Sequence, residues 1–188
     1  PKQAPWEMAW KAVRAFFGYE APKGLSAPKK PAVAPSKGFD MDSYLRTTAQ
    51  VESSNNPRAK ASTSSATGLY QFTAGTWNDV TNKMNVTYTL ADRKDPAKSE
   101  EVMREFTKRN VERAREDLGR EPTHLDAYMY HFLGRSAPKV LQADEKAIAA
   151  SLVTKAQAKA NKSVFFDKDG RARTVKEVLD RYREKGFQ

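Results

Sequence analysis

A carboxylate and an amide, separated by a polar loop, could carry chemistry in this chain. Glu52 ends a helical pattern, a Ser/Asn/Thr-rich stretch follows, and the segment Gly-Leu-Tyr-Gln then ends at Gln71. A carboxyl group that stays protonated near neutral pH can act as a general acid, provided that apolar or aromatic groups surround it. We therefore predict Glu52 as a general acid, with an ordinary surface carboxylate at a helix end as the alternative. The expected apolar surroundings are Leu69, Tyr70, Phe72, Tyr128 and Phe132.

A second carboxylate near the first would indicate a reaction with paired carboxyl groups, in which one is the acid and the other the nucleophile or base. Residues 53–78 contain no Asp or Glu, which weakens that alternative. The nearest later candidates are Asp79, Asp92, Asp95 and Asp126. The simpler interpretation of Asp79 and Asp126 is that they are solvated charges on helices.

These residues need a scaffold, and the pattern from Phe39 onward predicts mainly α structure with little β. Asp40 or Asp42 can cap a helix that ends near Glu52, and Thr73 can cap the next. A long helix is expected over residues 98–118, and Thr123 opens another that ends at Gly134. We predict one further helix from the spacing of Ile148, Leu152, Val153 and Ala156.

The C-terminal part is predicted to contain a turn followed by a last helix. The sequence around Asp169 and Gly170 favours a small turn or hairpin, rather than a calcium loop. Thr174 and Glu177 form a capping box for a helix that bears Val178, Leu179 and Tyr182.

Residues 1–38 differ in composition from the rest, which predicts two parts: residues 1–38 and a domain over residues 39–188. Near the beginning, bulky apolar residues recur at helical spacing and predict an amphipathic helix; they are Trp6, Ala9, Trp10, Val13, Phe16 and Phe17. Residues 21–37 are rich in Pro, Ala and Lys and predict an extended basic linker. We expect the helix within residues 1–20 to bind another protein, with the chain's own domain and a membrane surface as the alternatives.

The composition restricts the chemistry and the partners. A formal net charge of +10 favours an anionic partner such as nucleic acid, acidic lipid or an acidic cell-wall polymer. The chain has no cysteine and two histidines, His124 and His131, so neither thiol catalysis nor a metal site is expected, and no cofactor is predicted. We find no apolar run of membrane-spanning length and no secretory signal, and we expect no transmembrane segment.

Three separated motifs resemble the soluble lytic transglycosylase family of the lysozyme-like superfamily, particularly its bacteriophage members. They are the Glu-Ser pair at Glu52, the Gly-Leu-Tyr-Gln segment ending at Gln71, and the sequence Tyr-Met-Tyr-His-Phe-Leu-Gly ending at Gly134. The resemblance covers roughly residues 42–142. It implies a lysozyme-like helical domain. It also implies a reaction in which the substrate's own acetamido oxygen replaces the enzyme's nucleophile and its C6 hydroxyl replaces water, so that the product has a 1,6-anhydromuramyl end.

The resemblance also implies roles for single residues. Ser62 matches a substrate-contacting serine, and Gln71 would hydrogen-bond the sugar or its acetamido group. Gly68 would permit close approach of the glycan to the backbone, with a simple turn glycine as the alternative. Many relatives have Ala-Tyr-Asn-x-Gly as the third motif, so this chain departs from them. Tyr128 and His131 are three residues apart on one helix face, and both are expected to point at the cleft.

The sequence therefore predicts a lytic transglycosylase that cuts the β-1,4 bond between N-acetylmuramic acid and N-acetylglucosamine, with Glu52 as acid and base. We expect it in a phage particle, or in the host cytoplasm with delivery to the cell wall, and its partners to be glycan strands and other phage proteins. The alternatives are a lysozyme-type muramidase, a structural protein of the virion and a nucleic-acid-binding protein, the last without a recognition motif.

Overall fold

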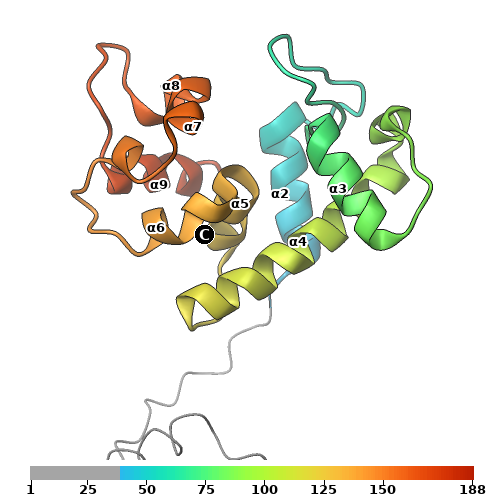
Figure 1. The fold of residues 1–188 in the computed structure, drawn as a ribbon, viewed down its shortest axis with the longest axis horizontal. Coiled ribbons are helices and arrows are strands. Elements are labelled where there is room, and N and C mark those ends of the chain that lie inside the picture. The colour runs from blue at the N-terminus through green and yellow to red at the C-terminus, as the bar shows by residue number, and fades with distance from the viewer. Residues whose placement is uncertain (1–38) are drawn as a thin grey trace, which may run out of the picture. The chain divides into compact units, whose positions relative to one another are not determined.

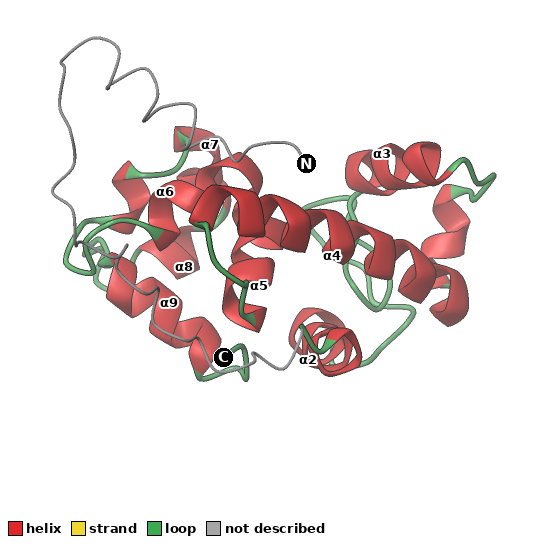
Figure 2. Cartoon of the chain, turned by 90° about the horizontal axis from the view of Figure 1, so that it is seen from below, coloured by secondary structure: helices red, strands yellow, loops and turns green. Residues whose placement is uncertain are grey.

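The protein is described here from a computed structural model that covers residues 39–188, and this range is mainly helical (Figure 1). The predicted amphipathic helix and linker of residues 1–38 lie outside the described residues. Helices and loops account for nearly all of Figure 2, and the extended pairs in this range are isolated antiparallel bridges such as Lys60 with Thr67. The predicted fold class, mainly α with little β, is confirmed.

Helices α2 (Met41–Ser53) and α3 (Ala74–Met84) begin at the caps that the sequence predicted. The Asp40 carboxylate accepts a hydrogen bond from the backbone N–H of Ser43, and the Thr73 hydroxyl accepts one from Thr76. Both helices end at a residue in the left-handed conformation, Ser54 and Asn85 respectively. The polar stretch after Glu52 therefore terminates α2, as expected.

Helix α4 (Pro96–Leu118) is the longest helix of the described range and contacts α2, α3, α5 and α6. Figure 1 shows it running from the side of α3 to the side of α6. It begins slightly earlier than the predicted residue 98, because Asp95 is the N-cap and Pro96 occupies the first turn, where its missing N–H costs no hydrogen bond. The short 3₁₀ helix η1 (Leu90–Lys94), which the pattern did not predict, precedes it.

Helix α5 (His124–Leu133) has the predicted bounds and is surrounded by protein on most sides. Thr123 and Asp126 form its capping box, and Gly134, with φ 53°, ends it. Two further turns follow that the sequence did not predict, the 3₁₀ helix η2 (Gly134–Ser136) and the helix α6 (Ala137–Leu141). The element α6 packs against α4 and α5.

The single helix predicted around residues 148–156 is wrong. Ile148 is extended and pairs with Thr174, and a 3₁₀ turn η3 (Ala149–Ser151) follows. Thr154 then acts as an N-cap, forming a capping box with Gln157, so that a new helix α7 (Lys155–Ala160) starts there. The apolar spacing resembled one helix because it ran across this cap, which interrupts the backbone.

The predicted C-terminal hairpin and last helix are present, and a short helix that was not predicted precedes them. Helix α8 (Lys162–Phe165) leads into a hairpin in which Phe166 pairs with Ala172 and Gly170 adopts φ 82°. Helix α9 (Val175–Arg183) starts at the Thr174 capping box. Beyond it, the Phe187 ring is fully buried and stacks on Tyr128 at 4.2 Å between centroids. None of the helices in residues 39–188 is long and apolar enough to cross a membrane.

Candidate active site

The Glu52 carboxylate, in the last turn of α2, is bound by a side chain from α5. The Tyr128 hydroxyl donates a hydrogen bond of 2.7 Å to Glu52 Oε1. Tyr128 is 4% exposed, whereas the Glu52 side chain keeps 20% of its surface. Tyr128 thus packs in the core and also binds Glu52, whereas its sequence pattern could not decide between core packing and a role in the site. The carboxylate is held at a helix end while one side of it stays accessible.

His131 approaches the same carboxylate oxygen from one turn further along α5. Its Nε2 lies 3.4 Å from Glu52 Oε1, and its side chain is 14% exposed. The imidazole packs between Tyr128, at 5.4 Å, and Phe106 of α4, at 5.6 Å between ring centroids. The sequence prediction that Tyr128 and His131 share a helix face is confirmed, and that face is directed at Glu52.

Aromatic side chains that the site prediction did not include complete the surroundings of Glu52. Tyr44 of α2 is fully buried, and Tyr182 of α9 lies 5.0 Å from Tyr128 between ring centroids. The charge of Glu52 contributes to raising the pKa of both phenols, after burial, which is the larger cause. In the sequence both tyrosines occupied apolar stripes, a pattern that indicates core packing and carries no sign of a site.

The pKa of Glu52 differs in direction from what the general-acid argument assumed. Burial raises it and is the largest single influence. The hydrogen bonds from His131 and Tyr128 and the positive charges of His131 and Lys185 together outweigh burial, so the pKa lies below its ordinary value of 4.5. The prediction that apolar surroundings alone keep Glu52 protonated is therefore wrong for the free protein, because polar donors reach the carboxylate.

The loop between α2 and α3 is fixed by the predicted binding residues themselves. The Gln71 amide nitrogen donates to the backbone carbonyls of Gly68, at 2.8 Å, and Ala59, at 3.3 Å. Gly68 adopts φ +86°, and a Cβ there would lie 1.9 Å from the carbonyl oxygen of Arg93. The close approach that Gly68 permits is thus one to the chain's own backbone. Arg93 in turn donates to the carbonyls of Ser65 and Phe72.

Three further residues of the predicted site lie in different settings. Ser62 is exposed on this loop. Tyr70 and Phe72 are buried, and the Phe72 ring contacts Phe106 at 5.9 Å between centroids, so it reaches His131 through an intermediate ring. Only Tyr128 and His131, of the predicted binding residues, are recorded in contact with Glu52.

The four candidate second carboxylates are all engaged elsewhere. Asp79 is exposed and pairs with Lys83. Asp92 completes the capping box of η1 and pairs with Lys98, and Asp95 caps α4. Asp126 is 2% exposed and binds Arg120 through both oxygens. The interpretation of Asp79 as a solvated charge is confirmed. The same interpretation of Asp126 is wrong, because this carboxylate is buried and is bound by Arg120 and by the backbone N–H of Thr123.

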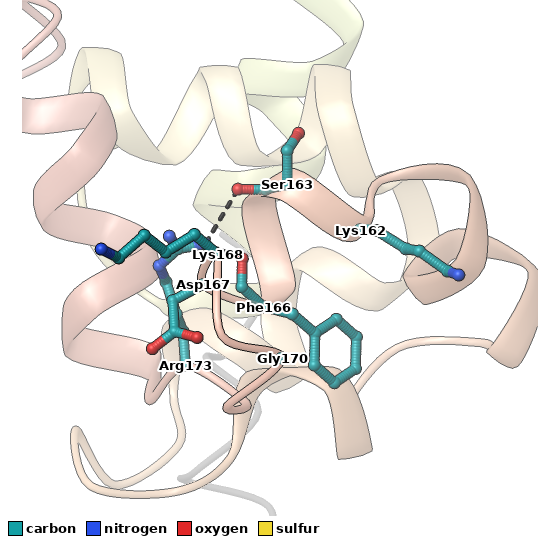
Figure 3. A pocket seen from close by; sticks show the side chains of 7 residues that line it. All are labelled: Lys162, Ser163, Phe166, Asp167, Lys168, Gly170 and Arg173. Atoms are coloured by element: carbon teal, nitrogen blue, oxygen red, sulfur yellow. Dashed lines mark hydrogen bonds between the residues drawn. The ribbon is translucent and has the colours of Figure 1, made fainter.

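A hollow of about 660 Å³ lies apart from these residues, between α8 and the hairpin that follows it (Figure 3). Phe166, Lys162 and Lys168 line it, and Arg173 donates to the carbonyl of Ser163 beside it. None of the predicted site residues contributes to it. Within residues 39–188, no group of three acidic or histidine side chains is arranged to hold a metal ion.

A comparison with family models found a match that spans most of these residues. Residues 33–130 match the family described as the transglycosylase SLT domain. Within the described range, the match extends from α2 through most of α5 and includes Glu52, the loop with Gln71, and Tyr128. His131 lies one position beyond its end.

Proposed function

This chain belongs to the transglycosylase SLT family, and we propose that it cleaves the β-1,4 bond between N-acetylmuramic acid and N-acetylglucosamine in peptidoglycan with Glu52 as the acid and base. The observation that carries the proposal is the 2.7 Å hydrogen bond between Tyr128 and Glu52. It joins two distant motifs at one partly exposed carboxylate. The Glu52 side chain is therefore both oriented and accessible, as a group that exchanges protons with a substrate must be.

The proposed reaction uses one carboxyl group twice. Glu52 gives its proton to the glycosidic oxygen as the bond to C1 of the muramyl sugar breaks. The C6 hydroxyl of that sugar then attacks C1 and returns a proton to Glu52, so the product is a 1,6-anhydro end and no water is consumed. Tyr128 keeps Oε1 in place through both steps.

The positions of the other acids support this reaction over hydrolysis. A muramidase needs a second carboxylate across the scissile bond from the first. Asp92 and Asp95 serve as helix caps, Asp126 is bound by Arg120, and Asp79 pairs with Lys83. The muramidase reaction is the second candidate, and it requires an acid that leaves its present partner.

We propose substrate contacts for the remaining predicted residues. Gln71 donates its amide hydrogens to the loop, so its carbonyl oxygen is the part offered to an acetamido N–H. Ser62, exposed on the same loop, is offered as a hydrogen-bonding group. Gly68 would act by shaping the loop. Tyr128 and His131 would contact the sugar nearest Glu52.

We further propose that the protein acts on the cell wall as part of a phage particle or at host lysis. The resemblance of the Tyr-x-x-His-Phe-Leu-Gly sequence to phage enzymes supports this, as does the net charge of +10, which suits the carboxylate-bearing wall polymer. Co-purification of the protein with particles would support the virion assignment.

The experiment that tests the reaction is mass analysis of purified peptidoglycan after digestion, with Glu52→Gln as the inactive control. A transglycosylase leaves anhydromuramyl ends, and a muramidase leaves reducing ends that are heavier by one water. Anhydro products from the wild type alone support the proposal. Reducing ends would establish the muramidase, and no soluble product at any enzyme concentration would favour a non-enzymatic role.

A further inference from the structure

Glu52 and His131 form a close acid and base pair at the proposed site. The His131 Nε2 and Glu52 Oε1 atoms are 3.4 Å apart, and both side chains keep only a small exposed fraction, 14% and 20%. The other imidazole nitrogen, Nδ1, is buried and has no hydrogen-bond partner within residues 39–188. Among the described residues, the carboxylate is therefore the one recorded polar partner of this imidazole.

The free protein and the proposed reaction require different protonation states of Glu52. With His131 and Tyr128 beside it, Glu52 is ionised at neutral pH, because its pKa lies below the ordinary value. Cleavage requires Glu52 to carry a proton when the glycan is bound. A proton must therefore reach Oε1 between substrate binding and bond breaking. Tyr128 lies closer to Oε1, but its raised pKa keeps it a neutral phenol, so the nearest basic side chain is His131.

We infer that His131 is the proton partner of Glu52: it stores the proton as an imidazolium and passes it from Nε2 to Oε1 when the glycan covers the pair. The inference rests on the proposed function. A bound glycan excludes water, and loss of water penalises two opposite charges more than two neutral groups. The ion pair then becomes a neutral imidazole and a protonated carboxyl group.

The proton balance closes over one cycle. Glu52 gives the proton to the glycosidic oxygen and regains one from the C6 hydroxyl, so it leaves the reaction protonated. When product departs and water returns, the proton moves back from Oε1 to Nε2. His131 does not react with the sugar itself and acts only by supplying the proton to Glu52. Its imidazole is held in place between the rings of Tyr128 and Phe106.

The other ionisable groups around the pair do not duplicate this role. Tyr44 of α2, Tyr128 of α5 and Tyr182 of α9 all have a raised pKa, mainly through burial, and stay neutral near pH 7. Lys185 adds positive charge at Glu52. On α4 the residue against His131 is the uncharged Phe106, and its charged neighbours Glu105 and Arg109 pair with each other.

The test is the pH dependence of kcat/KM on soluble peptidoglycan fragments for the wild type, His131→Gln and Tyr128→Phe. Two coupled groups titrate as a pair, so the alkaline limb of the wild type reports the loss of the proton that Glu52 and His131 share. In His131→Gln the last proton belongs to Glu52 alone. Its alkaline limb should move down by about one pH unit or more, roughly a tenfold loss at neutral pH relative to its own acid plateau.

Tyr128→Phe is the matched control, because it removes the other hydrogen bond to Oε1 without removing a group that titrates in this range. Its rate should fall while its alkaline limb does not move down. If His131→Gln gives a profile of unchanged shape and lower height, His131 is only structural and the inference is overturned. His131→Asn replaces it if the Gln variant does not fold. A wild type that yields no anhydro product overturns the proposed function, and this inference with it.

Discussion

The last turn of α2 and the first turn of α5 each place a carboxylate inside the protein, and the two are bound in different ways. Asp126, 2% exposed, accepts hydrogen bonds at both oxygens from Arg120 and a further one from the backbone of Thr123. Glu52 receives Tyr128 and His131 on the same oxygen, Oε1. A carboxylate with both oxygens bound stabilises a helix end, whereas one held by a single oxygen leaves the other for a substrate.

The largest expected effect of this difference is on catalysis at Glu52. Glu52→Gln keeps the shape and the acceptor for Tyr128 but cannot donate a proton as an acid. We expect peptidoglycan cleavage to fall by at least about a hundredfold, given the usual contribution of a general acid. Release of soluble fragments measures it, with circular dichroism to show an intact fold. A variant that keeps more than about a hundredth of the rate would refute the role of Glu52.

The reverse behaviour is expected at Asp126, where stability should change and chemistry should not. Asp126→Ala removes the capping box of α5 and leaves Arg120 without its partner. The free energy of unfolding should fall by about 2 kcal/mol, as measured by urea denaturation. Asp79→Ala is the control, since its exposed pair with Lys83 contributes only about 0.5 kcal/mol. Equal effects of the two variants would remove the distinction between the two carboxylates.

The sequence predicted the fold well where a local signal marks an element. Asp40, Thr73, Thr123 and Thr174 each cap a helix as expected. The prediction failed at residues 148–156, where apolar spacing continued across the Thr154 cap. Helical periodicity reports which face is buried, and it does not report whether the backbone is continuous.

The candidate site was only partly predictable, for a related reason. Motif residues such as Glu52 and Tyr128 carry a recognisable sequence, and the structure brings them together. Tyr44 shares α2 with Glu52, whereas Tyr182 lies on α9 and Lys185 follows that helix, so the proximity of these two to Glu52 depends on tertiary packing. The lowered pKa of Glu52 depends on His131, Tyr128 and Lys185, which only the folded chain brings to the carboxylate, so it could not be predicted from the sequence.

A smaller effect is expected at Gln71, whose amide donates to two backbone carbonyls within the loop between α2 and α3. Gln71→Ala leaves the carbonyls of Ala59 and Gly68 without this donor. We expect a loss of about 1 kcal/mol, roughly fivefold in kcat/KM. Gln142→Ala is the matched control, because that amide also binds one backbone carbonyl, that of Asp117. A silent Gln71→Ala would mean that the amide has no part in binding the substrate.

The smallest effect on turnover is expected from deleting residues 1–38, which include the predicted amphipathic helix. Within the described domain, the first residues and the last residues both pack on α2 and α5. Phe39 packs on Tyr44 and His124, the His124 Nε2 lies 2.9 Å from the Asp40 carbonyl, and the His124 backbone N–H donates to Gln188. Phe187 packs between Tyr44 and Tyr128. These contacts tie both segments to the helices that carry the site.

Turnover of purified peptidoglycan by residues 39–188 should therefore stay within about twofold of the full chain, less than about 0.5 kcal/mol in the activation barrier. Under the proposed role in a phage particle, the same deletion should abolish incorporation, because the predicted amphipathic helix, with several large aromatic residues on one face, suits a partner protein. Turnover by released fragments and co-purification with particles measure the two effects separately. An inactive or unfolded truncated protein would show that residues 1–38 complete the core, and normal incorporation would refute anchoring through the helix.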